Sequence, residues 1–145
     1  MPNIYADISV ISKKSNLDLL SKITGLTPVM QHNINYLTKR GIVLDYSQWV
    51  YKTNVIETYN TEDVSKHIIL PFKNCISEFI EFLNKNSCEV SICFVIGDVT
   101  DSMPSLIISR EMISFAAKIN AEIYFDGVLS VKYNPTVSNN SKSPE

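Results

Sequence analysis

Residues 63–86, DVSKHIILPFKNCISEFIEFLNKN, carry the strongest helical pattern of the chain and decide how it folds. Apolar side chains recur at steps of three and four residues, the period of a helix with one buried face: Val64, Ile68, Phe72, Cys75, Ile76, Phe79, Ile80 and Leu83. This spacing predicts the main core helix. Pro71 interrupts it, because the proline ring clashes with the preceding turn, so the helix either kinks there or begins with Pro71 as its first residue.

Strands are predicted on both sides of this helix. Residues 5–11 alternate apolar with polar side chains, which is the period of a strand with one buried face. Further strands are expected through Trp49, over residues 89–99, and from residue 121 to residue 130 or 132. Shorter helices are expected after Asn16 and after Ser109, because both residue types cap helices.

The middle of the chain gives a weaker pattern. Residues 31–41 show no clear period and are interpreted as a long loop. Residues 41–54 are rich in strand-forming side chains and are predicted to form a hairpin that turns near residues 45–47. Trp49 is either a core anchor or a contact platform.

Together these elements predict an α+β fold, a single domain with an antiparallel sheet of about four to six strands and helices packed on one face. A chain of 145 residues is the usual size of one domain. We expect that domain to cover residues 1–133. The last residues, 134–145, read NPTVSNNSKSPE and are polar and free of aromatic side chains, so we expect them to form a disordered tail.

The charge and the apolar runs limit the classes of partner. A formal net charge of −2 and an isoelectric point near 5.7 disfavour nucleic-acid binding, which depends on clustered Lys and Arg side chains. Neither a leader pattern at the start nor an apolar run of about 20 residues is present, so we expect a cytoplasmic protein without a membrane partner. The oligomeric state is left open by the sequence.

The residue types that usually carry catalysis or bind metals are few and scattered. His32 and His67 are the two histidines, and both are interpreted as surface residues. The cysteines have no C-x-x-C spacing, which predicts neither a disulfide framework nor a zinc site. The four glycines stand singly, so they form no phosphate-binding loop. We therefore expect no catalytic residue, no metal and no cofactor.

Carboxylates are the remaining chemical feature. Asp98 and Asp101 share a loop, and Glu122 and Asp126 share one face of the last strand with Tyr124 between them. Three interpretations stay open: a solvated outer face, a general acid and base pair, or a surface that binds a partner.

The order of the segments resembles the bacterial family catalogued as DUF4279, a domain of unknown function. The resemblance covers most of residues 4–130 and rests on TGLTP at residues 24–28, Trp49, ISREMI at residues 108–113 and AEIYFD at residues 121–126. The chain departs from the family pattern at residues 24–25, where Leu-Gly is usual, and at Glu122 and Tyr124. No catalytic residue is implied by the resemblance.

The resemblance implies a biological role for the chain. Small bacterial proteins of this kind look like the immunity proteins encoded beside polymorphic or contact-dependent toxins, which occupy a toxin's active site or its substrate surface. The expected function is therefore binding and neutralisation of a cognate toxin, such as a nuclease domain, in the cytosol. The alternatives are a small ligand-binding or carboxylate-based enzyme domain, and a homo-oligomer that pairs an exposed sheet edge.

The binding face is predicted from charge and spacing. Inhibitors of enzymes that act on nucleic acid use acids and aromatic side chains, which complement a basic active site. The hypothesis is that five residues contact the partner, with Tyr124 as the main hot spot: Asp98, Asp101, Glu122, Tyr124 and Asp126. The loop at residues 31–41 is the next candidate.

Overall fold

The computed structural model describes residues 1–100 and 102–128 of the 145-residue chain. In chain order the elements are β1 (Asn3–Ser12), α1 (Leu19–Thr24), β2 (Met30–His32), β3 (Ser47–Lys52), β4 (Ile56–Glu57), α2 (Glu62–Ile69), the 3-10 helix η1 (Leu70–Phe72), α3 (Ile76–Lys85), β5 (Glu89–Gly97), α4 (Arg110–Lys118) and β6 (Ala121–Val128). The predicted α+β class is confirmed. The predicted boundary between domain and tail, at residues 133 and 134, lies outside the described residues.

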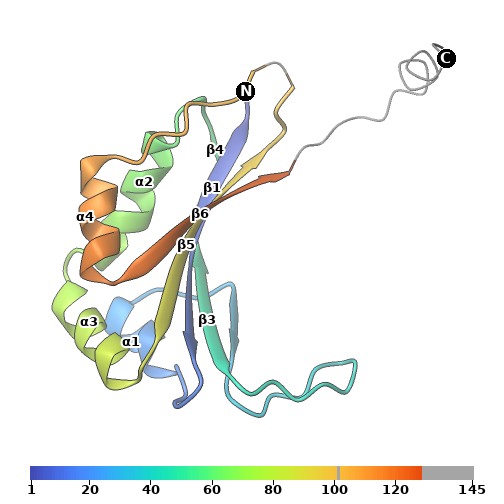
Figure 1. Cartoon of the computed structure of the whole chain (residues 1–145), viewed down its shortest axis with the longest axis vertical. Coiled ribbons are helices and arrows are strands. Elements are labelled where there is room, and N and C mark those ends of the chain that lie inside the picture. The colour runs from blue at the N-terminus through green and yellow to red at the C-terminus, as the bar shows by residue number, and fades with distance from the viewer. Residues whose placement is uncertain (101, 129–145) are drawn as a thin grey trace, which may run out of the picture.

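The described strands form one sheet in the order β2-β3-β1-β5-β6, and β4 pairs with the start of β1 (Figure 1). All of these pairs are antiparallel except β5 with β6, which run parallel. The sheet is therefore mixed, which corrects the prediction of a wholly antiparallel one. The cause is the connection, because α4 carries the chain back along the sheet between the end of β5 and the start of β6.

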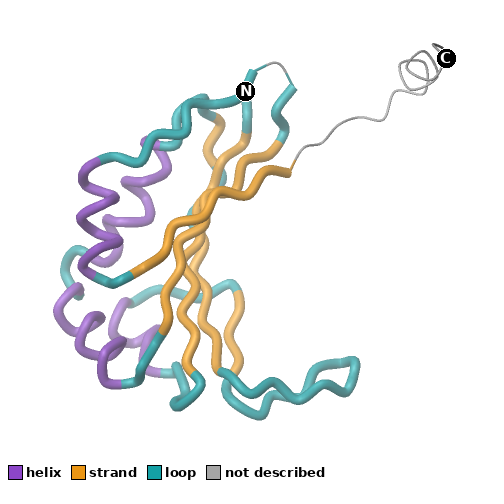
Figure 2. Tube along the Cα trace, viewed as in Figure 1, coloured by secondary structure: helices purple, strands orange, loops and turns teal. Residues whose placement is uncertain are grey.

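The helices lie against one face of this sheet, as predicted (Figure 1, Figure 2). On that side every second residue of the two central strands is buried: Ile4, Ala6, Ile8 and Val10 in β1, and Val90, Ile92, Phe94 and Ile96 in β5. The opposite face carries no helix. None of the described helices is long and apolar enough to cross a membrane.

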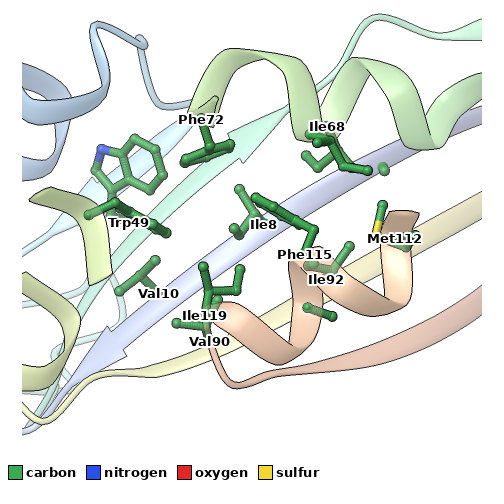
Figure 3. Packing of buried hydrophobic residues seen from close by; sticks show 14 of the residues in the cluster. Ile8, Val10, Trp49, Ile68, Phe72, Val90, Ile92, Met112, Phe115 and Ile119 are labelled. Carbon is green, nitrogen blue, oxygen red and sulfur yellow. The ribbon is translucent and has the colours of Figure 1, made fainter. Parts of the chain in front are cut away.

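Aliphatic side chains and several aromatic rings fill the core between the helices and the sheet (Figure 3). Phe72 lies at its centre, with ring centroids 4.9 Å from Phe79 and 5.7 Å from Phe115. Trp49 is fully buried, and its indole Nε1 donates a hydrogen bond of 3.1 Å to the Ser21 hydroxyl. Trp49 is therefore a core residue and not part of a contact surface.

The deciding stretch, residues 63–86, forms two α-helices with a short 3-10 helix between them, and not one continuous helix. The first, α2, ends at Ile69, η1 follows with Pro71 in its first turn, and α3 begins at Ile76. Proline is tolerated in a first turn, where its missing N–H has no helical partner to lose. The break also turns the chain, so that Phe72 and Phe79 both reach the core.

The middle of the chain differs from the prediction. Met30–His32 forms β2 on the edge of β3, where a loop was expected. The hairpin turn lies at residues 38–41 and not at residues 45–47, because Thr38 N–H bonds the Ile42 carbonyl at 2.8 Å and Gly41 supplies a positive φ of 80°. Residues 33–46, called the arm below, form a narrow ribbon that extends away from the helices (Figure 1).

Candidate functional site

The face of the sheet without helices gathers side chains from four strands. We call this set the open face, and it consists of Tyr5, Asp7, Ser9, Ile11, Gln48, Val50, Lys52, Glu89, Ser91, Cys93, Val95, Glu122, Tyr124 and Asp126. Strand register aligns it in rows, and one row runs Lys52, Asp7, Cys93, Tyr124 across β3, β1, β5 and β6. Residues distant in the sequence therefore lie side by side.

The open face is acidic. It holds four carboxylates, Asp7, Glu89, Glu122 and Asp126, and one ammonium group, Lys52. The whole chain has a net charge of only −2, so negative charge is concentrated on this face. Such a distribution attracts a positively charged partner and speeds its approach.

Asp7 lies half-buried near the middle of the open face. Burial raises the pKa of its carboxyl group, the Lys52 ammonium lowers that pKa and the Asp126 carboxylate raises it. Lys52 itself lies over the Tyr5 ring, with its Nζ 4.1 Å from the ring centroid. The net direction is upward, so the ionised form of Asp7 is less well stabilised here than in water.

The three predicted residues of β6 share the open face, as the spacing required. Glu122, Tyr124 and Asp126 pair in register with Ser91, Cys93 and Val95 of β5, which belong to the same face. The Tyr124 hydroxyl donates a hydrogen bond to the Glu122 carboxylate, which raises the pKa of Tyr124. This bond orients an aromatic ring that is 50% exposed.

Asp98, the described loop aspartate, stands apart from Glu122. Asp98 follows the end of β5, three residues beyond Val95, which puts it roughly 10 Å along the strand direction from the level of Asp126. Its carboxylate accepts a 2.5 Å hydrogen bond from the Asn3 side-chain amide, and its φ is +56°. Asp101 lies outside the described residues. Of the five predicted residues, the three in β6 therefore lie together on one face. Asp98 lies beyond the end of β5, away from Glu122.

A polar hollow of about 450 Å³ opens at the other end of the face. Its lining includes Ile11 of β1, Glu89 and Ser91 of β5, and Glu122 and Tyr124 of β6. Two carboxylates thus border one depression. Glu89 was not identified in the sequence, because only strand pairing places it near Glu122.

The arm adds an apolar element on the same side of the molecule (Figure 1). Four of its large side chains are between 50% and 61% exposed: Tyr36, Leu37, Ile42 and Val43. His32 at its base lies between Tyr36 and Tyr46, with ring centroids 5.6 Å and 5.1 Å away. Residues 31–41, predicted as the second candidate surface, thus overlap most of the exposed arm.

The described residues offer little nucleophilic or metal chemistry. Cys93 lies beside Asp7, but burial and then the Asp7 and Asp126 carboxylates raise the pKa of its thiol, which opposes formation of the reactive thiolate. Burial also raises the pKa of Cys88 to about 11. No group of three metal-ligating side chains occurs among residues 1–100 and 102–128.

The comparisons with known proteins identify the family. The family described as "Domain of unknown function (DUF4279)" matches residues 2–129, which is most of the chain. The chain belongs to this family. Each strand that the structure describes lies inside the matched range, so the open face is built from DUF4279 residues. The family resemblance noted in the sequence is confirmed. No curated protein and no solved structure matches the chain.

Proposed function

We propose that this DUF4279 protein is an immunity protein that binds and neutralises a cognate bacterial toxin domain through its open face. The observation that carries the proposal is a sheet face without a helix layer, on which four carboxylates and two tyrosines from three strands lie together. Partner surfaces on proteins combine aromatic contact area with charges that fix the orientation of the complex.

The half-buried state of Asp7 favours a basic partner. Its carboxylate is held in a site that raises its pKa, so its charge is only partly stabilised in the free protein. An Arg or Lys side chain brought to the face by a partner stabilises the ionised form and gains free energy by doing so. Toxin domains that act on nucleic acid have such basic surfaces, because they bind phosphates.

The test uses the cognate toxin domain that the proposal requires, sought among the proteins encoded beside the gene for this chain. The double substitution Tyr124→Ala with Asp126→Ala removes one aromatic and one acid from the open face. We expect it to weaken binding by about 30-fold or more, as loss of a hot spot does. Isothermal titration calorimetry gives the affinity, and a growth assay with the toxin gives the loss of protection.

The matched control changes one aromatic and one acid elsewhere. Tyr59 is 40% exposed and Glu111 is exposed on α4, and neither belongs to the open face. The double substitution Tyr59→Ala with Glu111→Ala should leave the affinity unchanged. If instead the control weakens binding and the open-face variant does not, the toxin binds another surface.

The polar hollow supports a second candidate, a small-molecule site that takes a cationic ligand. Glu89 and Glu122 border it, and paired carboxylates bind cations or serve as acid and base. Under this candidate a cation such as arginine or putrescine raises the melting temperature, and Glu122→Gln removes the effect. Lack of any shift with such cations excludes this role and leaves protein binding.

A further inference from the structure

The strand β6 forms an open edge of the sheet. It is eight residues long and pairs with β5 on one side, and no other described strand pairs with it. Backbone N–H and C=O groups on the outer side of such a strand have no partner within the sheet. They form a template on which another extended chain can add as a new strand.

The two edges of the sheet differ in how they are protected. The opposite edge, β2, is only three residues long, and short edge strands discourage pairing. The sequence of β6 is AEIYFDGV, which contains neither proline nor lysine, the residues that usually block an edge. Its length and composition therefore leave β6 able to pair.

The side chains of β6 specify what kind of strand fits. On the open face an added strand meets Glu122, Tyr124 and Asp126. On the helix side it meets Phe125, which is 38% exposed and stacks on Phe94 with ring centroids 5.4 Å apart. Cross-strand neighbours stabilise a sheet when their charges are opposite. The complementary strand therefore alternates basic and apolar residues.

A second copy of this chain is a poor occupant of the same edge. Pairing two β6 strands about a two-fold axis puts the Glu122 and Asp126 carboxylates of both copies on one face. The sequence of β6 supplies no Lys or Arg to offset them. Like charges on neighbouring strands destabilise the pairing, so self-association through β6 is disfavoured.

We infer that β6 receives an antiparallel strand from a basic protein partner, with Lys or Arg residues facing Glu122 and Asp126 and apolar residues facing Phe125. This inference rests on the proposed function and deepens it, because it names the mode of binding at the same face. The new strand extends the sheet next to β6 and brings the partner to the border of the open face.

The experiment uses two synthetic octapeptides with blocked ends, one alternating Lys with Val and one alternating Glu with Val. Amide hydrogen exchange of the full chain, followed by NMR, reports on each residue of β6 separately. Alternate amides of β6 point away from β5 and should exchange quickly in the free protein. The Lys-Val peptide should slow them and bind about tenfold more tightly than the Glu-Val peptide.

The charge contribution is tested with Glu122→Gln combined with Asp126→Asn. This variant keeps the shape of the edge, and it should bring the affinities of the two peptides together. Slow exchange of all β6 amides in the free full chain would mean that residues 129–145 or a second copy already cover the edge, and that overturns the inference. Equal protection by both peptides, or protection at β2 alone, also overturns it.

The same readout separates this inference from the proposed function. If the toxin domain binds tightly but the outward amides of β6 still exchange quickly, the immunity role stands and strand addition is wrong. If the Lys-Val peptide protects β6 while the toxin domain does not bind, strand addition stands and the immunity role is wrong.

Discussion

Asp7 is a half-buried carboxyl group whose environment opposes its ionised form. It stands between buried residues of β1, and its raised pKa means that the folded state binds a proton more tightly than the unfolded chain. Stability therefore falls as the pH rises from about 4, the usual pKa of Asp, through the raised pKa of Asp7. Under the proposed function, a basic partner at this uncovered surface would offset that loss of stability.

The corresponding prediction concerns Asp7→Asn, which removes the charge and keeps the shape. The variant should be more stable than the wild type, and this gain in unfolding free energy should be larger at pH 7 than at pH 4. The difference between the two gains should be at most about 1 kcal/mol, because solvent screens the charge at a half-buried site. Urea unfolding at the two pH values measures this. Asp45→Asn, in the exposed part of the arm, is the control. A gain that is equal at both pH values contradicts the account of Asp7.

Phe79 tests the packing of the core. It is fully buried and contacts Phe72, so Phe79→Ala leaves a cavity beside another aromatic ring. We expect a loss of about 3 to 5 kcal/mol in unfolding free energy. Ile113→Ala, at a position that is 55% exposed, should change stability by less than about 0.5 kcal/mol. Chemical denaturation of the two variants decides whether α3 presents this face to the core.

At the scale of elements, the buried Thr61 joins the start of α2 to the segment that leads into α4. Its hydroxyl accepts a hydrogen bond of 2.9 Å from Ile107 N–H and lies 2.8 Å from the Ile107 carbonyl, to which it donates. Thr61 N–H also bonds the Ser105 carbonyl at 3.2 Å. This contact fixes the long connection between β5 and β6.

The isosteric substitution Thr61→Val removes the hydroxyl and leaves the Ile107 N–H without that partner. We expect a loss of about 1 to 3 kcal/mol and faster amide exchange at residues 105–107. Thr27→Val, at an exposed position, should be nearly neutral. Unchanged exchange at residues 105–107 would show that other contacts hold the segment.

The sequence predicted those elements that carry their own signal. β1 alternates because one of its faces is buried, and β5 is a more continuous apolar run because it is buried along most of its length. Both strands occur where the sequence predicted them. The short β2 has no such signal, because three residues become a strand only by pairing with β3. The parallel pairing of β5 and β6 likewise depends on the path through α4, which no local pattern specifies.

The site was predictable to the same extent. Side chains two apart in one strand must share a face, so Glu122, Tyr124 and Asp126 were correctly grouped from spacing alone. Lys52 and Glu89 come from other strands and could be placed only once the register was known. Asp98 follows β5, the strand beside β6, but it lies beyond the end of β5 opposite to the level of Glu122 and does not join it.

The whole molecule has two different sides. The helices cover one face of the sheet and build the core, and the arm extends on the other side, where the open face lies (Figure 1). The carboxylates of the open face and the exposed apolar residues of the arm thus both lie away from the helix layer. Under the proposed function, this separation would let the binding surface change without disturbing the core.

The charge on that side predicts how the partner associates. The association rate constant with a basic toxin domain should fall on the order of tenfold between low and high salt, because salt screens charges that steer the encounter. The variant Glu122→Gln with Asp126→Asn should show a weaker dependence. Stopped-flow measurements at several salt concentrations give the salt dependence of the association rate constant for the wild type and for the variant. An identical salt dependence would argue against steering by the β6 carboxylates.

The most direct test of the central claim is an NMR chemical-shift map of the chain titrated with the toxin domain that the proposed function requires as its partner. The account predicts that the shifts change at open-face residues of β1, β5 and β6 and stay unchanged on the outer surfaces of α2, α3 and α4. Changes centred on those helices, with the open face unaffected, would contradict it.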